Sequence, residues 1–208
     1  MSKSAALMLS VVLMCPLVAF ANNNTFQNSG GQLTSNGTYL ILSGSTLSSV
    51  SMGGTSASGS LGAVSFTTGK LISGSLASGG MFAAGGSFQI SGSGSNGIPA
   101  GALFQGTFTG PVTWKAVWNP TGDHKGDWTY ELSGRISGTL ANSQKLTADF
   151  VAYTFDVPHG AEFSSSVRFK SGMATSVVAV PEPGTMALLG SGLLGLGLLG
   201  FRKRTARR

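Results

Sequence analysis

The sequence predicts an all-β domain, with a β-sandwich or jelly-roll as the preferred architecture and a β-solenoid as the alternative. Apolar and polar residues alternate through several short segments, and glycine, serine and asparagine separate these segments. No stretch of residues 22–179 keeps a 3.6-residue apolar period, so no helix is expected there. A solenoid requires a regular repeat, and the sequence holds only loose echoes of one. Each end of the chain departs from the pattern with one apolar run that predicts a helix.

Residues 1–21 have the features of a secretory signal peptide. Lys3 gives the positive start, an apolar run follows, and Ala19-Phe20-Ala21 is the small-x-small pattern that precedes cleavage. Cleavage after Ala21 would begin the mature chain at Asn22. It would also remove Cys15, the only cysteine, and leave the exported protein without disulfide or thiol chemistry.

The exported domain is expected to span residues 22–179. Its first part, to about Ala100, is dominated by Gly, Ser, Thr and Asn and has one charged residue, Lys70. This composition is also typical of a flexible linker. Two alternating sets favour short strands instead, namely Phe82, Ala84, Gly86, Phe88 and Ile90, and Val64, Phe66 and Thr68. We expect ordered strands here, with a mobile start over Asn22–Gln32.

The second part of the domain predicts a β-hairpin and two more strands. Alternation places Val112, Trp114, Ala116 and Trp118 on one face of the first hairpin strand, and Trp128, Tyr130 and Leu132 on one face of the second. The turn formers of Asn119–Gly126 connect them. Leu146–Phe155 and the alternating segment 162–170 are further strands, the latter half-buried with a charged outer face. The total expected is ten to twelve strands.

The last 29 residues contain three features in succession. Residues 180–185 read Val-Pro-Glu-Pro-Gly-Thr, and the two prolines predict an extended break. Residues 186–201 form an apolar run that predicts a transmembrane helix, although a helix of about 24 Å is short for a bilayer. A basic tail over residues 202–208 follows as a stop to transfer, with Arg202, Lys203, Arg204, Arg207 and Arg208.

In this order and at the terminus, these features resemble the PEP-CTERM protein-sorting signal. Its motif corresponds to Val180, Pro181, Glu182, Pro183 and Gly184. The resemblance implies a transient anchor in the inner membrane, recognition by an exosortase, cleavage near the motif, and a final place at the cell surface or outside the cell. It also suggests an exopolysaccharide matrix as a partner. The alternative is an ordinary C-terminal anchor, but a short helix interrupted by glycines fits a temporary anchor better.

The net charge of +6 belongs mostly to the two targeting segments. Residues 22–179 hold seven lysines and arginines against six aspartates and glutamates, a net charge of +1. A nearly neutral domain gives no support for nucleic-acid binding.

No catalytic motif, metal-binding motif or phosphate-binding loop is present, so we expect no enzyme activity and no cofactor. The two histidines lie in polar surroundings: His124 between Asp123 and Asp127, and His159 between Asp156 and Glu162. A hydrolase would need these groups to converge in a cleft. The preferred interpretation is that they occupy turns, because such residues tolerate turn geometry.

Trp114, Trp118 and Trp128 are the candidate ligand-binding residues, because tryptophans on one sheet face can form a platform for sugar rings. The preferred interpretation is that they belong to the core, since the opposite face, with Lys115, looks like the solvent side. The predicted function is therefore an exported surface or matrix protein without catalytic activity. The alternative is a carbohydrate- or ice-binding module of the exopolysaccharide matrix.

Overall fold

The computed structural model describes residues 23–52, 54–120 and 126–177, which form β-strands joined by turns and loops. Residues 22–178 make up one compact unit. The expected signal peptide, the sorting motif and both terminal helices lie outside the described residues. No helix within the described ranges is long and apolar enough to cross a membrane. The all-β prediction is confirmed for this unit.

The described residues form thirteen strands, a little more than the ten to twelve that the sequence predicted. They are β1 (Asn23–Ser29), β2 (Gln32–Ser35), β3 (Leu40–Met52), β4 (Thr55–Thr67), β5 (Leu71–Ser75), β6 (Gly79–Phe82), β7 (Gly85–Ser93), β8 (Ala100–Phe108), β9 (Val112–Asn119), β10 (Asp127–Leu140), β11 (Lys145–Thr154), β12 (Val157–Pro158) and β13 (Ser166–Val177).

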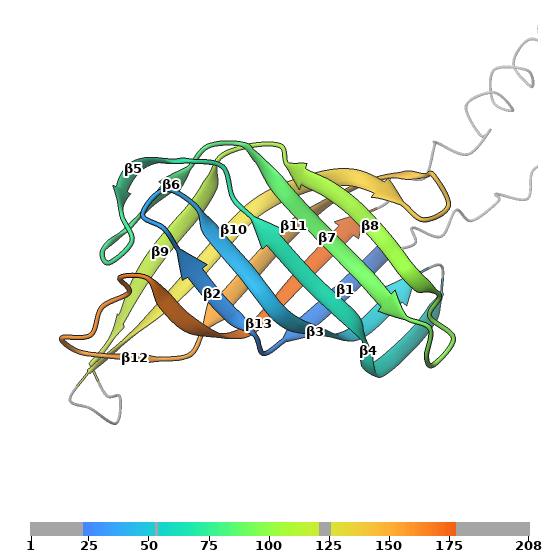
Figure 1. The fold of residues 1–208 in the computed structure, drawn as a ribbon, viewed down its shortest axis with the longest axis horizontal. Helices are drawn as coiled ribbons and strands as arrows, with labels where there is room; N and C mark the ends of the chain where they lie inside the picture. Colours follow the sequence, from blue (N-terminus) through green and yellow to red (C-terminus); the bar gives the residue numbers. More distant parts are fainter. Residues whose placement is uncertain (1–22, 53, 121–125, 178–208) are drawn as a thin grey trace, which may run out of the picture. The chain divides into compact units, whose positions relative to one another are not determined.

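Eight of these strands pair in a ring, so the sheet closes on itself. The order is β1, β3, β4, β7, β8, β10, β11 and β13, and β13 pairs again with β1 from Asn23↔Val177 to Ser29↔Ser171. Every pairing is antiparallel. In Figure 1 the strands on the near side and the far side cross at a slant, as expected when a closed sheet tilts its strands. The strands form one sheet instead of two facing sheets or stacked turns, which corrects both the sandwich and the solenoid predictions.

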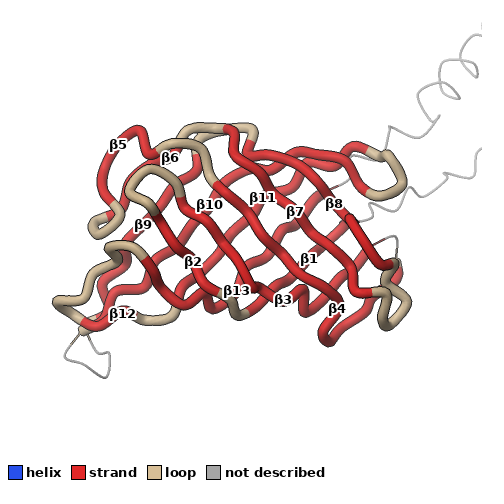
Figure 2. Tube along the Cα trace, in the orientation of Figure 1, coloured by secondary structure: helices blue, strands red, loops and turns tan. Residues whose placement is uncertain are grey.

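The other five strands continue positions of this closed sheet. β2 follows β1 past Gly30 and Gly31 and pairs with the same neighbours, β13 and β3. In the same way β9 extends β8 along β10, β12 extends β11, and β5 and β6 extend β4 and β7. The chain therefore runs up and down through eight successive positions, each beside the next in sequence (Figure 2).

The expected alternations are confirmed only in part, and the expected mobile start is wrong. Residues 83–84 separate β6 from β7, and Ala84 and Gly86 are exposed. The strand expected over residues 162–170 begins only at Ser166. Val64, Phe66, Phe82, Phe88 and Ile90 are all buried. The start of the chain forms strand β1, which pairs on both sides, with β13 and with β3. Its Gly/Asn-rich composition gave no sign of this, because β1 is held by backbone hydrogen bonds to strands distant in sequence.

Aromatic rings fill the interior of the closed sheet. Phe66 stacks on Phe88 at 5.8 Å, and both contact Phe108 and Phe150 edge-on or tilted, with ring centroids 4.9–5.9 Å apart. Such pairs each add about 0.5–1.5 kcal/mol beyond the burial of their area. All four rings are at most 2% exposed. The interior in this region is therefore a packed core.

The closed sheet has two different ends. The first and last described residues, Asn23 and Val177, are paired neighbours and lie at one end, which we call the terminal end. Strands β9 and β10 run to the opposite end, where Asn119 pairs with Asp127. The candidate tryptophans all lie on β9 and β10, and we call the end to which these strands run the open end.

Candidate functional site

Trp114 belongs to the core and is 1% exposed. Its ring stacks on Tyr130 at 4.9 Å with an interplanar angle of 8°, and Phe163 meets it edge-on at 5.5 Å. The indole Nε1 of Trp114 donates to the carbonyl of Leu76 at 2.8 Å. Leu76 lies in the turn between β5 and β6, so this turn covers the stacked rings. Burial removes Trp114 from the candidate ligand-binding residues.

Trp118 and Trp128 have the same inward parity but a different environment. They are paired neighbours on β9 and β10, with ring centroids 5.0 Å apart and an angle of 56°. Strand β6 pairs with β9 only as far as Gly79↔Lys115, so Trp118 lies beyond the part of β9 that β6 accompanies. Trp118 is 37% exposed, and Trp128 is half-buried. The inward face of these two strands thus opens to solvent at this end of the sheet.

His159 completes a group of three rings, which we call the aromatic rim: Trp118, Trp128 and His159. The imidazole of His159 meets the Trp118 ring edge-on at 5.3 Å. The backbone amide of His159 donates to the carbonyl of Gly126 at 3.2 Å, which ties the segment after β12 to the start of β10. The hydrogen bond holds the histidine against the tryptophan pair.

Gly126 makes close packing at the aromatic rim possible. Its φ is +116°, a conformation that residues with a side chain rarely adopt. A Cβ placed on it would lie 2.1 Å from the Trp118 ring. The chain can therefore pass directly beside the indole only with glycine at this position, and Trp118 is fixed between Gly126, Trp128 and His159.

Polar residues neighbour the aromatic rim in sequence, although Thr129 points to the opposite face of β10 from Trp128. Asp156 is exposed and accepts a hydrogen bond from the Thr129 hydroxyl at 2.7 Å. Asp127 is 4% exposed and stands next to Trp128 in sequence. The indole Nε1 of Trp128 is buried and has no acceptor in the part of the chain that the structure describes. This end of the sheet therefore combines flat aromatic surface with hydrogen-bonding side chains.

The described residues that a hydrolase would need do not form a metal-binding group. Asp123 and His124 lie outside the described residues. Glu162 is half-buried near Tyr130. Burial raises the pKa of the Tyr130 hydroxyl, and the charge of Glu162 adds to this effect, while the hydrogen bond with Phe163 opposes it. Over residues 23–52, 54–120 and 126–177, no three His, Cys, Asp or Glu side chains gather into a group that could hold a metal ion.

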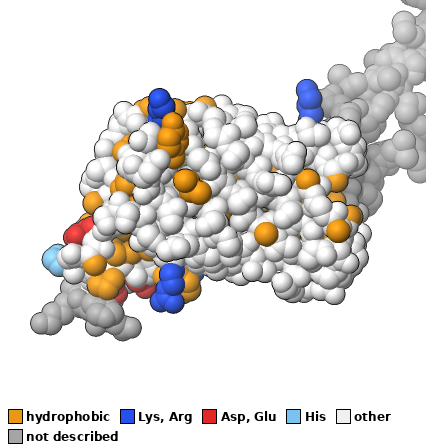
Figure 3. All heavy atoms as spheres, viewed as in Figure 1, with side chains coloured by type: hydrophobic (Ala, Val, Ile, Leu, Met, Phe, Trp, Pro, Cys, Tyr) orange, Lys and Arg blue, Asp and Glu red, His pale blue; other side chains and the backbone are white. Residues whose placement is uncertain are grey.

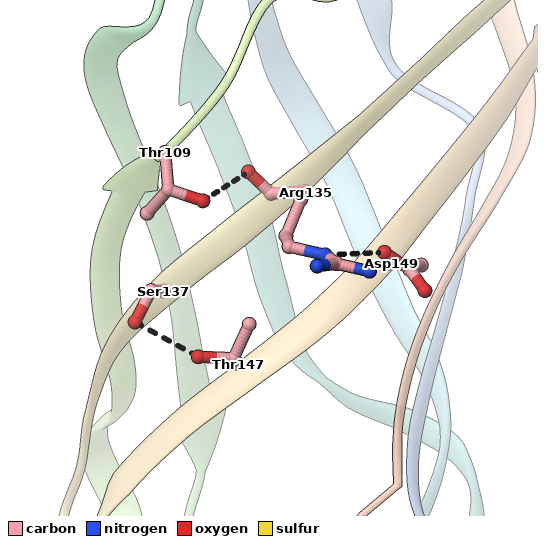
Figure 4. A network of polar contacts seen from close by, with 5 residues as sticks. All are labelled: Thr109, Arg135, Ser137, Thr147 and Asp149. Atoms are coloured by element: carbon pink, nitrogen blue, oxygen red, sulfur yellow. Dashed lines mark hydrogen bonds and ion pairs between the residues drawn. The ribbon is translucent and has the colours of Figure 1, made fainter.

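A polar network that the sequence did not point to lies on the outer face of β10 and β11 (Figure 4). The Arg135 guanidinium and the Asp149 carboxylate, which are paired neighbours across the two strands, form an ion pair at 3.0 Å. Thr147 donates to Ser137 at 3.1 Å, and these two residues are the next pair on the same face of the two strands. Both charged side chains are more than 60% exposed, so this pair stabilises the fold by less than about 1 kcal/mol. Only the strand register identifies it, because the two residues are distant in sequence.

Much of the outer face is free of charge. Across the described strands from β1 to β8, the side chains of the outer face are mainly Ser, Thr, Gln, Gly and Ala, and Lys70 in a connecting loop is the one charged residue. Figure 3 shows this on the visible face, where most of the surface is neither apolar nor charged. This surface offers hydroxyl and amide groups and no concentrated field for a charged ligand.

The comparisons with known proteins concern the end of the chain. Residues 179–208 match the family model described as the PEP-CTERM protein-sorting motif. No curated protein and no solved structure matches the chain. The motif implies export, surface sorting and processing by an exosortase. The chain thus ends in a PEP-CTERM protein-sorting motif, and it is in this sense an exosortase-sorted exported protein.

Proposed function

We propose that this chain is a non-catalytic surface protein that is retained at the cell surface or in the extracellular polymer after sorting. The observation that carries the proposal is the sorting motif over residues 179–208. The described domain is consistent with this role. Its interior is occupied by packed aromatic rings, so its interactions are expected to take place on the outside of the sheet and at its open end.

The nature of the outer surface supports a structural role in a hydrated polymer. Hydroxyl and amide side chains cover the strands from β1 to β8, and the domain has almost no net charge. Such a surface can exchange hydrogen bonds with neutral polymers without strong electrostatic selection.

A carbohydrate-binding role is the second candidate, and the exposure of Trp118 favours it. The ice-binding alternative would need a flat, threonine-rich face. A sheet that closes on itself is curved, so we do not propose this alternative.

The sorting part of the proposal can be tested with an epitope tag in the exposed turn at Asn96-Gly97 between β7 and β8. In cells with the exosortase, we expect the tag at the surface or in the medium on a shortened protein. Replacing Pro181, Glu182 and Pro183 by alanine should leave the full-length protein in the membrane fraction. The matched control, Pro99→Ala in an exposed loop, should be processed normally. A tag that stays in the cytoplasm would contradict the proposal.

The non-catalytic part needs a separate measurement. The processed protein is incubated with extracellular polysaccharide, and newly formed reducing ends are counted. We expect none above the background. Turnover that disappears in Asp156→Asn or Glu162→Gln would overturn this part and would leave the sorting result intact.

A further inference from the structure

We propose that the aromatic rim binds the ring of a neutral sugar, with the exposed face of Trp118 as the stacking surface. This proposal deepens the proposed function by naming the partner as a neutral polysaccharide. It rests on that function only for its biological setting, because the binding site itself is argued from the geometry of Trp118, Trp128 and His159.

The first step is the exposure of Trp118. Trp114 is four residues earlier on the same face of β9 and is covered by the turn after β5, with a hydrogen bond to its indole nitrogen. Trp118 has the same inward parity, but β6 ends before it. Trp118, a residue with a large apolar ring, is therefore left 37% exposed near the end of β9, at a position that a polar residue could occupy.

The second step is rigidity. Trp118 is held by Gly126 against one part of its ring, by Trp128 at 5.0 Å and by His159 at 5.3 Å. The hydrogen bond from His159 to Gly126 fixes these elements to one another. A ligand that stacks on Trp118 would therefore not have to order a mobile side chain, and this lowers the entropic cost of binding.

The third step is size. A tryptophan presents at most about 250 Å² of surface, so a ring that is 37% exposed offers on the order of 100 Å². A stable protein partner usually covers about 800 Å² on each side. The exposed surface of Trp118 alone would supply only a small part of such an interface, but it matches one face of a six-membered sugar ring.

The fourth step is chemistry. The apolar C–H face of a sugar ring packs on an aromatic face, while its hydroxyl groups at the edge need donors and acceptors. The His159 imidazole meets the Trp118 ring edge-on, and the indole Nε1 of the neighbouring Trp128 has no acceptor among the described residues. Aromatic surface bordered by such groups fits a sugar better than an aliphatic chain, which would use none of them.

The test uses the full chain in detergent with cellohexaose, chitohexaose and mannohexaose as probes and acyclic glucitol as the negative probe. Binding is followed by titration calorimetry and by tryptophan fluorescence. We expect at least one hexaose to bind with a dissociation constant of about 0.1–1 mM, as is usual for a single stacking site. Glucitol, which lacks the ring, should not bind.

Two variants assign the binding to Trp118. Trp118→Ala should weaken binding at least tenfold, and Trp118→Leu, which keeps bulk but removes the flat ring, should do the same if the alanine variant folds poorly. The matched control is Val117→Ala, at a residue 38% exposed on the opposite face of β9, and its binding should stay within twofold of the original.

Three results would overturn the proposal. The original chain could bind none of the hexaoses, a folded Trp118 variant could bind as tightly as the original, or the variant could change the oligomeric state in light scattering and leave sugar binding unaltered. None of these would affect sorting, because Trp118→Ala is expected to be exported and processed normally. Failure of this inference and failure of the proposed function are therefore distinguishable.

Discussion

Removal of the Tyr130 hydroxyl tests how the open end of the sheet is held together. This hydroxyl donates to the carbonyl of Ala77 at 2.9 Å and accepts from the backbone amide of Phe163 at 3.0 Å. One bond holds the turn between β5 and β6, and the other holds the segment before β13. Tyr130 is fully buried against Trp114. A single oxygen atom thus links two connecting segments to the core.

The magnitude follows from these two bonds. Tyr130→Phe leaves a buried amide of Phe163 without its acceptor, which costs about 1–3 kcal/mol, and it removes an ordinary bond to Ala77 worth about 0.5–1.5 kcal/mol. The expected loss in the free energy of unfolding is therefore about 2–4 kcal/mol. For a domain of this size, this corresponds to a fall in Tm of roughly 5–15 °C.

The measurement is urea unfolding of the processed protein, followed by tryptophan fluorescence, together with calorimetric melting. Tyr153→Phe is the control, because Tyr153 is 42% exposed on β11 and should lose less than about 0.5 kcal/mol. Equal losses in the two variants would refute the conclusion that the Tyr130 hydroxyl holds the two segments.

Two further predictions concern the same core. Burial raises the pKa of Tyr130 in the folded state, so the unfolded chain ionises first as the pH rises. The free energy of unfolding should therefore keep its full value below about pH 10 and fall above it. In unfolding curves taken across that pH range, Tyr130→Phe should show a smaller fall. Gly138→Ala should destabilise the protein by several kcal/mol, because its Cβ would lie 2.0 Å from a backbone oxygen of β8. Gly134→Ala is the matched variant on β10, where the nearest atoms are side-chain atoms 3.1 Å away; a similar loss of Tm in both would contradict this explanation.

Alternation in the sequence was sufficient to assign many side chains to the inside or the outside, but not to identify strand partners. Alternation correctly grouped Trp114 with Trp118 and Phe88 with Ile90. The closure of the sheet depends on the pairing of β1 with β13, whose residues are about 150 positions apart. Side-chain periodicity contains no information on such a pairing, since any half-buried strand shows the same pattern.

For the same reason, the sequence identified only part of the candidate site. Parity placed Trp114, Trp118 and Trp128 on the inward face, but the core interpretation holds for Trp114 alone, because Trp118 is exposed and Trp128 half-buried. The sequence could not show that the turn between β5 and β6 covers Trp114 but not Trp118, because this depends on the register of β6 with β9. Nor could it place His159 against Trp118, since their contact is made across a loop and a strand boundary.

Some glycines of the closed sheet leave room for its aromatic interior. Large rings can fill a narrow closed sheet only where neighbouring strands present no side chain. A Cβ on Gly172 would lie 2.9 Å from the Phe169 ring and 3.0 Å from the Phe150 ring, and a Cβ on Gly106 would lie 2.7 Å from the Phe104 ring. The phenylalanines thus occupy space that the glycines leave free. At these two positions, glycine and phenylalanine are two parts of one packing arrangement.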